Sequence, residues 1–359
     1  MKMNLDDIDT PFLWVDLDIM ESNIANLSSY FKSKGLEWRP HTKGIKIPEI
    51  AHQLLDAGAT GITCAKLSEA EVMVAGGINN ILIANQIVGE RKIDRLCKLS
   101  KKAEILVALD NEEVARQMDH LAQKNNVSLK ILVEVNVGMD RAGVDPGRST
   151  LNFCKRIVDF KHIDFLGLMA WEGHAAGILD HQNKTETISN SMKKLSETVE
   201  LIKKEGFNPK IISGAGSATY QISTQHNVYN EIQSGGAVFT DEAYTTWGAK
   251  TVSSLYLRSS VTSRPSKKRI ITDAGWKTLP GWIVNPQPQL LQTIESVSMS
   301  SEHGVIQLKE EDSSLISGNI LDYQVGYGDA TVFLHEYLYG MRNGTLESVW
   351  SVQGRGKYT

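Results

Sequence analysis

The chain has 359 residues, a length that favours one large α/β barrel with an additional module, or two domains. Hydrophobic residues make up 41% and charged residues 22% of the sequence, which excludes disordered, collagenous and fibrous proteins. The net charge of −4 provides no electrostatic surface for nucleic acid or for an anionic membrane, so we expect neither as a partner.

The cysteines and the N-terminal residues indicate a compartment. Cys64, Cys97 and Cys154 are too few and too far apart for a disulfide framework or a clustered metal site, which favours a reducing environment. Residues 1–14 are acidic and lack the apolar segment of a secretion signal. Because no apolar stretch approaches the roughly 20 residues of a membrane-spanning helix, we expect a soluble cytoplasmic protein.

Short apolar runs alternate with longer segments of helical periodicity over the first two thirds of the chain. The predicted strands are residues 36–38, 61–64, 80–84, 104–109, 129–135, 163–169, 209–213 and 228–232. Residues 111–123 and 191–206 place apolar side chains on one helical face, and Gly206 is a helix C-cap signal. Eight strands that alternate with helices predict an α/β fold, the (β/α)8 TIM barrel.

The composition changes after about residue 246, where Ser, Thr and β-branched residues dominate. Asn343 and Gly344 separate two apolar runs, which is a β-hairpin signal. We therefore predict a barrel over residues 16–245 and a mostly β C-terminal domain over residues 246–359. Residues 1–15 include a strand that we expect to join the β domain.

The first candidate for chemistry is the segment WRPHTKG, residues 38–44, just after the first predicted strand. If the chain stays extended here, Arg39, His41 and Lys43 share one face. The carboxyl ends of barrel strands carry the active site, and a lysine there can serve as a Schiff-base nucleophile. A solvated basic turn is the alternative interpretation.

Two glycine-rich segments follow the seventh and eighth predicted strands, at residues 212–220 and 233–239. Small residues let backbone N–H groups approach an anion, and the loops after strands seven and eight are the usual phosphate site of a TIM barrel. Together they indicate a phosphate-bearing ligand. Tight strand-to-helix turns without a ligand are the alternative.

Two further segments follow the fifth and sixth predicted strands. Arg141 can donate hydrogen bonds to a ligand, although an arginine here is also consistent with a surface ion pair. Trp171 is a stacking surface or a buried loop anchor, and His174 is a candidate acid or base.

A lysine at the barrel mouth with a phosphate site opposite suggests pyridoxal 5′-phosphate, PLP. The segments RPHTK, GITCAKLSEAEVM, ILIANQIVG, VEVNVGMDRAGV, SGAGSATY, YNEIQSGGAVF and DAGWKT occur in this order. The ordered set, which spans nearly the whole chain, resembles the family of D-threonine aldolase and eukaryotic-type D-serine dehydratase. That family is a branch of the alanine-racemase-like, fold-type III PLP enzymes.

The resemblance implies a cofactor site residue by residue. Lys43 matches the PLP lysine, Arg141 the arginine that reaches the cofactor, and Trp171 the position of an aromatic residue, usually Tyr, near its ring. The two phosphate loops match Ser213, Gly214, Gly216 and Ser217, and Gln233, Gly235 and Gly236. We add His41, from the same motif as Lys43, to the predicted cofactor-binding residues.

The chain departs from the family near its C-terminus, in the segment GYGDATVFLH. Relatives hold a divalent metal there through a histidine and, two residues later, Cys or Asp. Here Asp329 stands at the second ligand position, whereas Tyr327 replaces the histidine. Neutral tyrosine is a poor ligand for Zn²⁺ or Mn²⁺, so the sequence argues against a bound metal.

The resemblance implies a PLP-dependent lyase for a D-configured β-hydroxy amino acid, acting by retro-aldol cleavage or by elimination of water. A Schiff base on Lys43 would carry the reaction, with His174, His303, Tyr327 or a water near Asp329 moving the proton. The partners expected are a small amino-acid substrate and a second copy of the chain, since relatives are homodimers.

Three other functions stay open at this point. A PLP-dependent racemase or epimerase would use Tyr327 or Tyr337 as a second acid or base. A PLP-binding protein without turnover is the second, and a barrel aldolase whose lysine attacks a carbonyl directly is the third.

Overall fold

The computed structural model describes residues 5–359, which form two compact units. One unit contains residues 27–43, 48–235 and 356–359, and the other contains residues 5–26, 44–47 and 236–355. Each unit is described by itself below. Within the described residues, no helix has both the length and the apolar character that a bilayer crossing requires.

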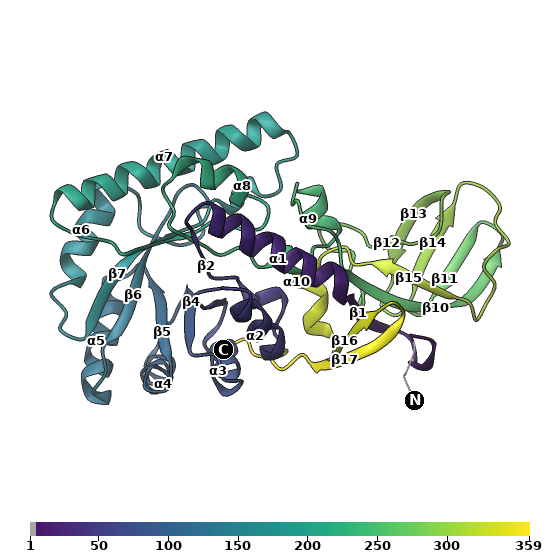
Figure 1. The fold of residues 1–359 in the computed structure, drawn as a ribbon, viewed down its shortest axis with the longest axis horizontal. Coiled ribbons are helices and arrows are strands. Elements are labelled where there is room, and N and C mark those ends of the chain that lie inside the picture. The colour runs from purple at the N-terminus through teal and green to yellow at the C-terminus, as the bar shows by residue number, and fades with distance from the viewer. Residues whose placement is uncertain (1–4) are drawn as a thin grey trace. The chain divides into compact units, whose positions relative to one another are not determined.

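The first unit is a parallel eight-stranded sheet with the strand order β2-β9-β8-β7-β6-β5-β4-β3. Figure 1 labels β2 and β4 to β7 of this sheet. The strands are β2 (Glu37–Trp38), β3 (Ile62–Cys64), β4 (Asn80–Gln86), β5 (Glu104–Leu109), β6 (Leu129–Val135), β7 (Ile163–Ala170), β8 (Ile211–Gly214) and β9 (Glu231–Ile232). A parallel bridge between His41 and Thr63 joins the two ends of the sheet. The predicted barrel is confirmed, with a strand at each of the eight predicted positions.

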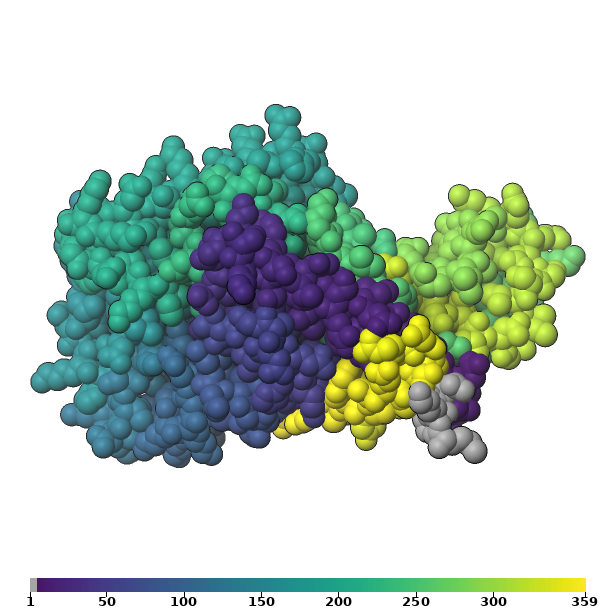
Figure 2. Space-filling model, viewed as in Figure 1, coloured from purple at the N-terminus to yellow at the C-terminus, as the bar shows by residue number. Residues whose placement is uncertain are grey.

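Helices alternate with these strands, and Figure 2 shows α4 to α7 on the surface of this unit, coloured blue to teal. They are α2 (Pro48–Asp56), α3 (Leu67–Ala75), α4 (Glu90–Ser100), α5 (Glu112–Asn125), α6 (Arg148–Ile157), α7 (His181–Lys204) and α8 (Tyr220–Ser223). Asn111 caps α5 by accepting hydrogen bonds from the backbone N–H groups of Glu113 and Val114. Asn126 ends the helix in the left-handed conformation.

Helix α7 is longer than its periodicity predicts. It begins at His181, ten residues before the predicted start, where the side chain of Asp180 accepts a hydrogen bond from the backbone of Asn183. The first turns of α7 are polar and carry no apolar stripe, so the capping residue Asp180 is their sequence signal for a helix. The predicted end is confirmed, since the helix stops at Lys204 and Gly206 follows with φ +91°.

The barrel interior combines an apolar layer with one buried ion pair. Leu82, Leu106, Ala108, Leu132 and Met169 pack together in the apolar layer. Arg39, which follows β2, donates to Glu231 at the start of β9 over 2.8 Å. The two side chains are 3% and 4% exposed, so neither charge is screened by bulk water.

The second unit is built on a nine-stranded sheet with the order β13-β14-β11-β10-β1-β16-β17, in which β15 pairs with β10 and β12. The strands are β1 (Phe12–Asp16), β10 (Leu255–Ser266), β11 (Arg269–Thr272), β12 (Gln287–Pro288), β13 (Ile294–Met299), β14 (Gly304–Leu308), β15 (Ile320–Gln324), β16 (Tyr337–Arg342) and β17 (Thr345–Ser351). Strand β1 lies between β10, which is antiparallel to it, and β16, which is parallel. The predicted mostly β C-terminal region is confirmed.

One long helix and two short ones also belong to this unit in whole or in part. Helix α1 (Leu17–Ser33) starts in it after β1, and α9 (Glu242–Thr246) and α10 (Gly328–Thr331) follow later in the chain. Asn343 and Gly344 join β16 to β17 with φ angles of 49° and 73°, so the predicted hairpin turn is confirmed.

The buried ion pair of the barrel yields a stability prediction. Replacing Glu231 by leucine leaves the Arg39 guanidinium buried without its carboxylate and is expected to lower the free energy of unfolding by about 3–5 kcal/mol. The double variant Arg39→Met with Glu231→Leu is expected to recover most of that loss, because it buries no charge. Urea unfolding measures both. A single variant as stable as the parent protein would contradict the prediction.

Candidate active site

Lys43 lies in a tight turn at the carboxyl end of β2. Residues Thr42–Gly44 form a 3-10 turn, and the backbone N–H of Lys43 donates to Nδ1 of His41 over 3.3 Å. The chain is therefore not extended through this segment, and the expected single face of Arg39, His41 and Lys43 is wrong. Arg39 forms the buried ion pair with Glu231, whereas Lys43 is the middle residue of the turn.

Trp171 lies beside both predicted cofactor cations. Nζ of Lys43 is 5.5 Å from the centroid of the indole ring, and the guanidinium carbon of Arg141 is 5.2 Å from it. These distances are in the range of cation–π contacts. A Cβ on Gly216 would lie 2.9 Å from Nε1 of the indole, so the first glycine loop packs against the same ring.

The two glycine loops contact each other through hydroxyl groups. Nε2 of Gln233 donates to Oγ of Ser213 over 3.0 Å. The hydroxyl oxygens of Ser217 and Ser234 are 3.1 Å apart. Ala215 adopts a left-handed conformation at φ 56°, which turns the first loop sharply.

Glycine is required where these loops touch their neighbours. A Cβ on Gly214 would overlap the backbone oxygen of Ala170, and a Cβ on Gly235 would overlap the backbone of His41. The second loop is therefore packed directly on the turn that carries Lys43. The predicted residues of this unit form one connected set around the barrel mouth, whereas Gly236 belongs to the other unit, where it packs on the ring of Tyr244.

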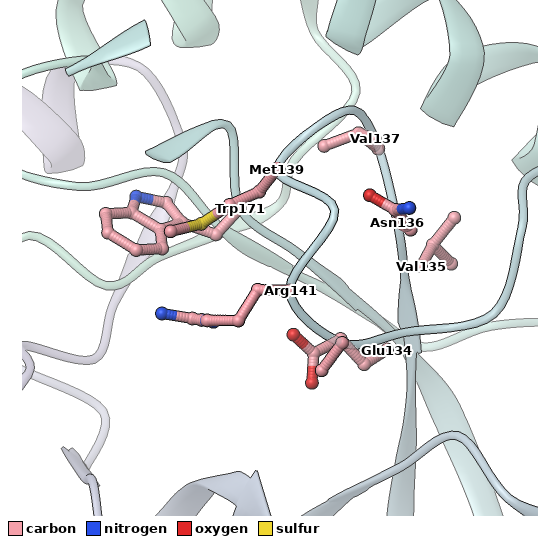
Figure 3. A pocket seen from close by; sticks show the side chains of 8 residues that line it. Glu134, Val135, Asn136, Val137, Met139, Arg141 and Trp171 are labelled. Atoms are coloured by element: carbon pink, nitrogen blue, oxygen red, sulfur yellow. The ribbon is translucent and has the colours of Figure 1, made fainter. Parts of the chain in front are cut away.

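A hollow opens next to Arg141 and Trp171 in the same unit (Figure 3). Its lining residues are Glu134, Val135, Asn136, Val137, Met139, Arg141, Ala142 and Trp171. Glu134 is 6% exposed and accepts a hydrogen bond from the side chain of Gln86. Burial raises the pKa of Glu134, and the Gln86 hydrogen bond and the Arg141 charge partly offset that rise.

Glu134 is not among the site residues predicted from the sequence, although the sequence contains a signal for a buried acid. It is a lone acid near the end of the otherwise apolar run LKILVEV, where an isolated charge is expensive to bury without partners. His174 lies near this hollow, because a Cβ on Gly138 would come within 3.1 Å of its Nε2. Its side chain is exposed.

Tyr327 and Asp329 lie together in the other unit. The hydroxyl of Tyr327 donates to Oδ2 of Asp329 over 3.1 Å. The rings of Tyr244, Trp247 and Trp282 surround Tyr327 at centroid distances of 6.0, 5.7 and 5.9 Å. Burial, and then the charge of Asp329, raise the pKa of Tyr327 far above its usual range, so the phenol stays protonated.

The donor set around Asp329 does not fit a divalent metal. The neighbouring Asp241 is 2% exposed and accepts hydrogen bonds from the backbone of Tyr244 and of Gly328. Burial raises the pKa of Asp241 to about 8, so this carboxyl group holds its proton at neutral pH. Across the described part of the chain, no three His, Cys, Asp or Glu side chains converge as a ligand set.

His303 lies at the turn between β13 and β14, where its side chain is exposed and its backbone oxygen accepts from Ser300. These strands form one edge of the sheet, whereas Tyr327 follows β15. The structure thus does not add His303 to the cluster of Tyr327 and Asp329, and its role stays a prediction.

The raised pKa of Glu134 predicts a dependence of stability on pH. The folded protein holds this proton more tightly than the unfolded chain, so ionisation costs stability as pH rises from the unfolded pKa to the folded pKa. Glu134→Gln is therefore expected to lose less stability than the parent protein on going from pH 4.5 to 7, by about 1.4 kcal/mol for each unit of pKa shift. Urea unfolding at both pH values measures the difference. Glu197→Gln, at an exposed site on α7, is the control, and equal losses in the parent and Glu134→Gln would contradict the prediction.

Comparison with known proteins agrees with a barrel followed by a mostly β region. Residues 15–243 match the family model of the alanine racemase N-terminal domain, and residues 254–341 match that of a putative serine dehydratase domain. The D-threonine aldolase of an Arthrobacter species is 30% identical over 97% of this chain and 93% of its own length. The 3-hydroxy-D-aspartate aldolase of Paracoccus denitrificans is 29% identical over 99% of this chain and 94% of its own length.

A solved structure matches nearly the whole chain. The D-threonine aldolase from Filomicrobium marinum superimposes with a TM-score of 0.96 at 29% identity, over 100% of this chain and 98% of that one. The predicted resemblance to the D-threonine aldolase and D-serine dehydratase group is confirmed. The chain belongs to the family defined by the alanine racemase N-terminal domain, followed by a serine dehydratase-like domain.

Proposed function

We propose that this protein is a PLP-dependent lyase that acts on D-configured β-hydroxy amino acids. The observation that carries the proposal is the connected set at the barrel mouth, where Lys43 and Arg141 lie beside Trp171 and the two glycine loops meet. Similarity over the full chain to D-threonine aldolase and 3-hydroxy-D-aspartate aldolase supports it.

The residues present fit a phosphate-bearing aromatic aldehyde. The Lys43 amine would hold the cofactor covalently, and the indole of Trp171 would flank its ring. The close backbone packing at Gly214 and Gly235 leaves loops without side-chain bulk, and the hydroxyls of Ser213 and Ser217 are there to donate to phosphate. When bound, PLP supplies an electron-withdrawing ring that stabilises negative charge at the substrate Cα.

The chain must also move a proton from the substrate β-hydroxyl group. His174 lies in the same unit as Lys43, and its exposed imidazole can accept a proton at Nε2. Tyr327 is a hydrogen-bond donor because its phenol stays protonated against Asp329. His303 and a water near Asp329 remain the other candidates for the base.

We favour retro-aldol cleavage over dehydration, because the two relatives described above are named aldolases. Aldol cleavage releases an aldehyde, dehydration releases a keto acid, and racemisation releases the other enantiomer. We further propose a cytoplasmic homodimer, with the barrel over residues 16–245 and the β domain over residues 246–359. Light scattering of the purified protein tests the assembly.

The central prediction is tested with a panel of D-β-hydroxy amino acids. The parent protein is expected to form an aldehyde and to show a visible absorbance band from bound PLP. Lys43→Ala is expected to lose both while staying folded, because no amine is left to bind the aldehyde. Lys124→Ala, on the surface of α5, is the matched control and should behave as the parent. Full activity of Lys43→Ala would refute the proposal.

A second prediction concerns metals. We propose that activity does not require a divalent cation, because Tyr327 donates to Asp329 and the phenol is a poor ligand. Treatment with EDTA, followed by removal of the chelate, is expected to leave the rate of aldehyde release unchanged. Loss of activity with recovery upon addition of Mn²⁺ or Zn²⁺ would overturn this expectation.

A further inference from the structure

A buried carboxylate lies directly behind Trp171 in the chain. Glu172 is 0% exposed. Its Oε1 accepts a hydrogen bond from the hydroxyl of Ser223 over 2.5 Å, and its Oε2 accepts one from the hydroxyl of Tyr229 over 2.8 Å. Both oxygens are therefore held by neutral donors from other parts of the barrel.

No salt bridge to Glu172 is found among residues 5–359. Burial of a carboxylate without a cation is costly, and hydrogen bonds to the charged group recover part of that cost. Tyr229 is a committed donor, because burial and the charge of Glu172 raise the pKa of its phenol well above the usual range. An apolar side chain at position 172 would be buried at a lower cost in free energy. We therefore attribute the carboxylate to the segments that its hydrogen bonds hold together.

The hydrogen bonds join three segments of the barrel unit that are far apart in sequence. Glu172 follows β7, Ser223 ends α8 after β8, and Tyr229 precedes β9. The ring of Tyr229 packs against Gly214, where a Cβ would overlap it, so the same phenol supports the start of the first glycine loop. The Tyr229 hydroxyl also lies 3.1 Å from the backbone oxygen of Ala170.

The segment that Glu172 anchors is the one that presents Trp171. A Cβ on Gly173 would lie 2.6 Å from the indole, and a Cβ on Gly216 would lie 2.9 Å from its Nε1. The ring is therefore confined between its own turn and the first glycine loop. A small displacement at residue 172 would move the indole relative to Lys43 and Arg141, which face it.

We propose that Glu172 is a positioning residue, which fixes the indole of Trp171 and the loop Gly214–Ser217 in one arrangement through Tyr229 and Ser223. Its side chain is fully buried, and it acts through Tyr229 and Ser223, to which its two oxygens are hydrogen-bonded. The consequence for the cofactor rests on the proposed function, whereas the coupling of the two loops does not.

The first test measures PLP binding by the full-length protein and by two variants of the Glu172 network, beside one control variant. Glu172→Gln keeps the size of the side chain but removes the charge and one acceptor, and Tyr229→Phe removes one donor. Both are expected to raise the dissociation constant for PLP about tenfold, the effect of one lost charge-assisted hydrogen bond. Both should also change the visible circular dichroism of the bound cofactor. Tyr30→Phe is the matched control, since its hydroxyl bonds to Thr224 and not to the Glu172 network.

Amide hydrogen exchange without PLP gives the second readout. In Glu172→Gln and Tyr229→Phe, exchange is expected to rise together in residues 170–176 and 214–219, with the rest of the barrel unchanged. If Glu172→Gln does not fold, Tyr229→Phe and Ser223→Ala decide the outcome. Unchanged exchange in both loops of the folded variants would overturn the proposal. Failure of the parent protein to bind PLP would refute the proposed function and leave the exchange experiment valid.

Discussion

The closure of eight parallel strands into one barrel is the constraint on which the candidate site depends. Parallel strands bring all their carboxyl ends to the same rim, so loops that are far apart in sequence become neighbours. Few backbone contacts close the barrel. Strands β2 and β9 pair over two residues each, and the bridge between His41 and Thr63 connects the end of β2 to β3. The turn with Lys43 follows this junction directly, which places the lysine at a seam of the barrel rather than on a long strand.

Two cations and two buried acidic residues surround Trp171 in the barrel unit. The two cations, Lys43 and Arg141, lie beside the indole. The buried Glu134 lines the hollow next to Arg141, and the buried Glu172 follows Trp171 in the chain. Each carboxylate is held by neutral donors, Gln86 in one case and Tyr229 with Ser223 in the other. Glu134 also interacts with the charge of Arg141, whereas no cation pairs with Glu172 among the described residues.

The sequence predicted the strands well, because each is an apolar run between helical segments, and the fold class follows from their alternation. The sequence did not predict features that depend on contacts between residues far apart in the chain. The burial of Arg39 depends on Glu231, which lies almost 200 residues later, and the turn at Thr42 breaks the expected alternation. No sequence pattern marks Glu172, because its partners Ser223 and Tyr229 are adjacent to it only in the fold.

The left-handed conformation of Ala215 in the first glycine loop has a consequence for the unloaded protein. A residue with a Cβ pays a conformational penalty of roughly 1–2 kcal/mol in this region, where glycine would not. The folded barrel therefore imposes the loop's shape in advance, and the entropy of ordering it is lost during folding rather than during ligand capture. Under the proposed function, the loop therefore has the same shape with and without PLP, and loading the cofactor requires no reordering of this segment.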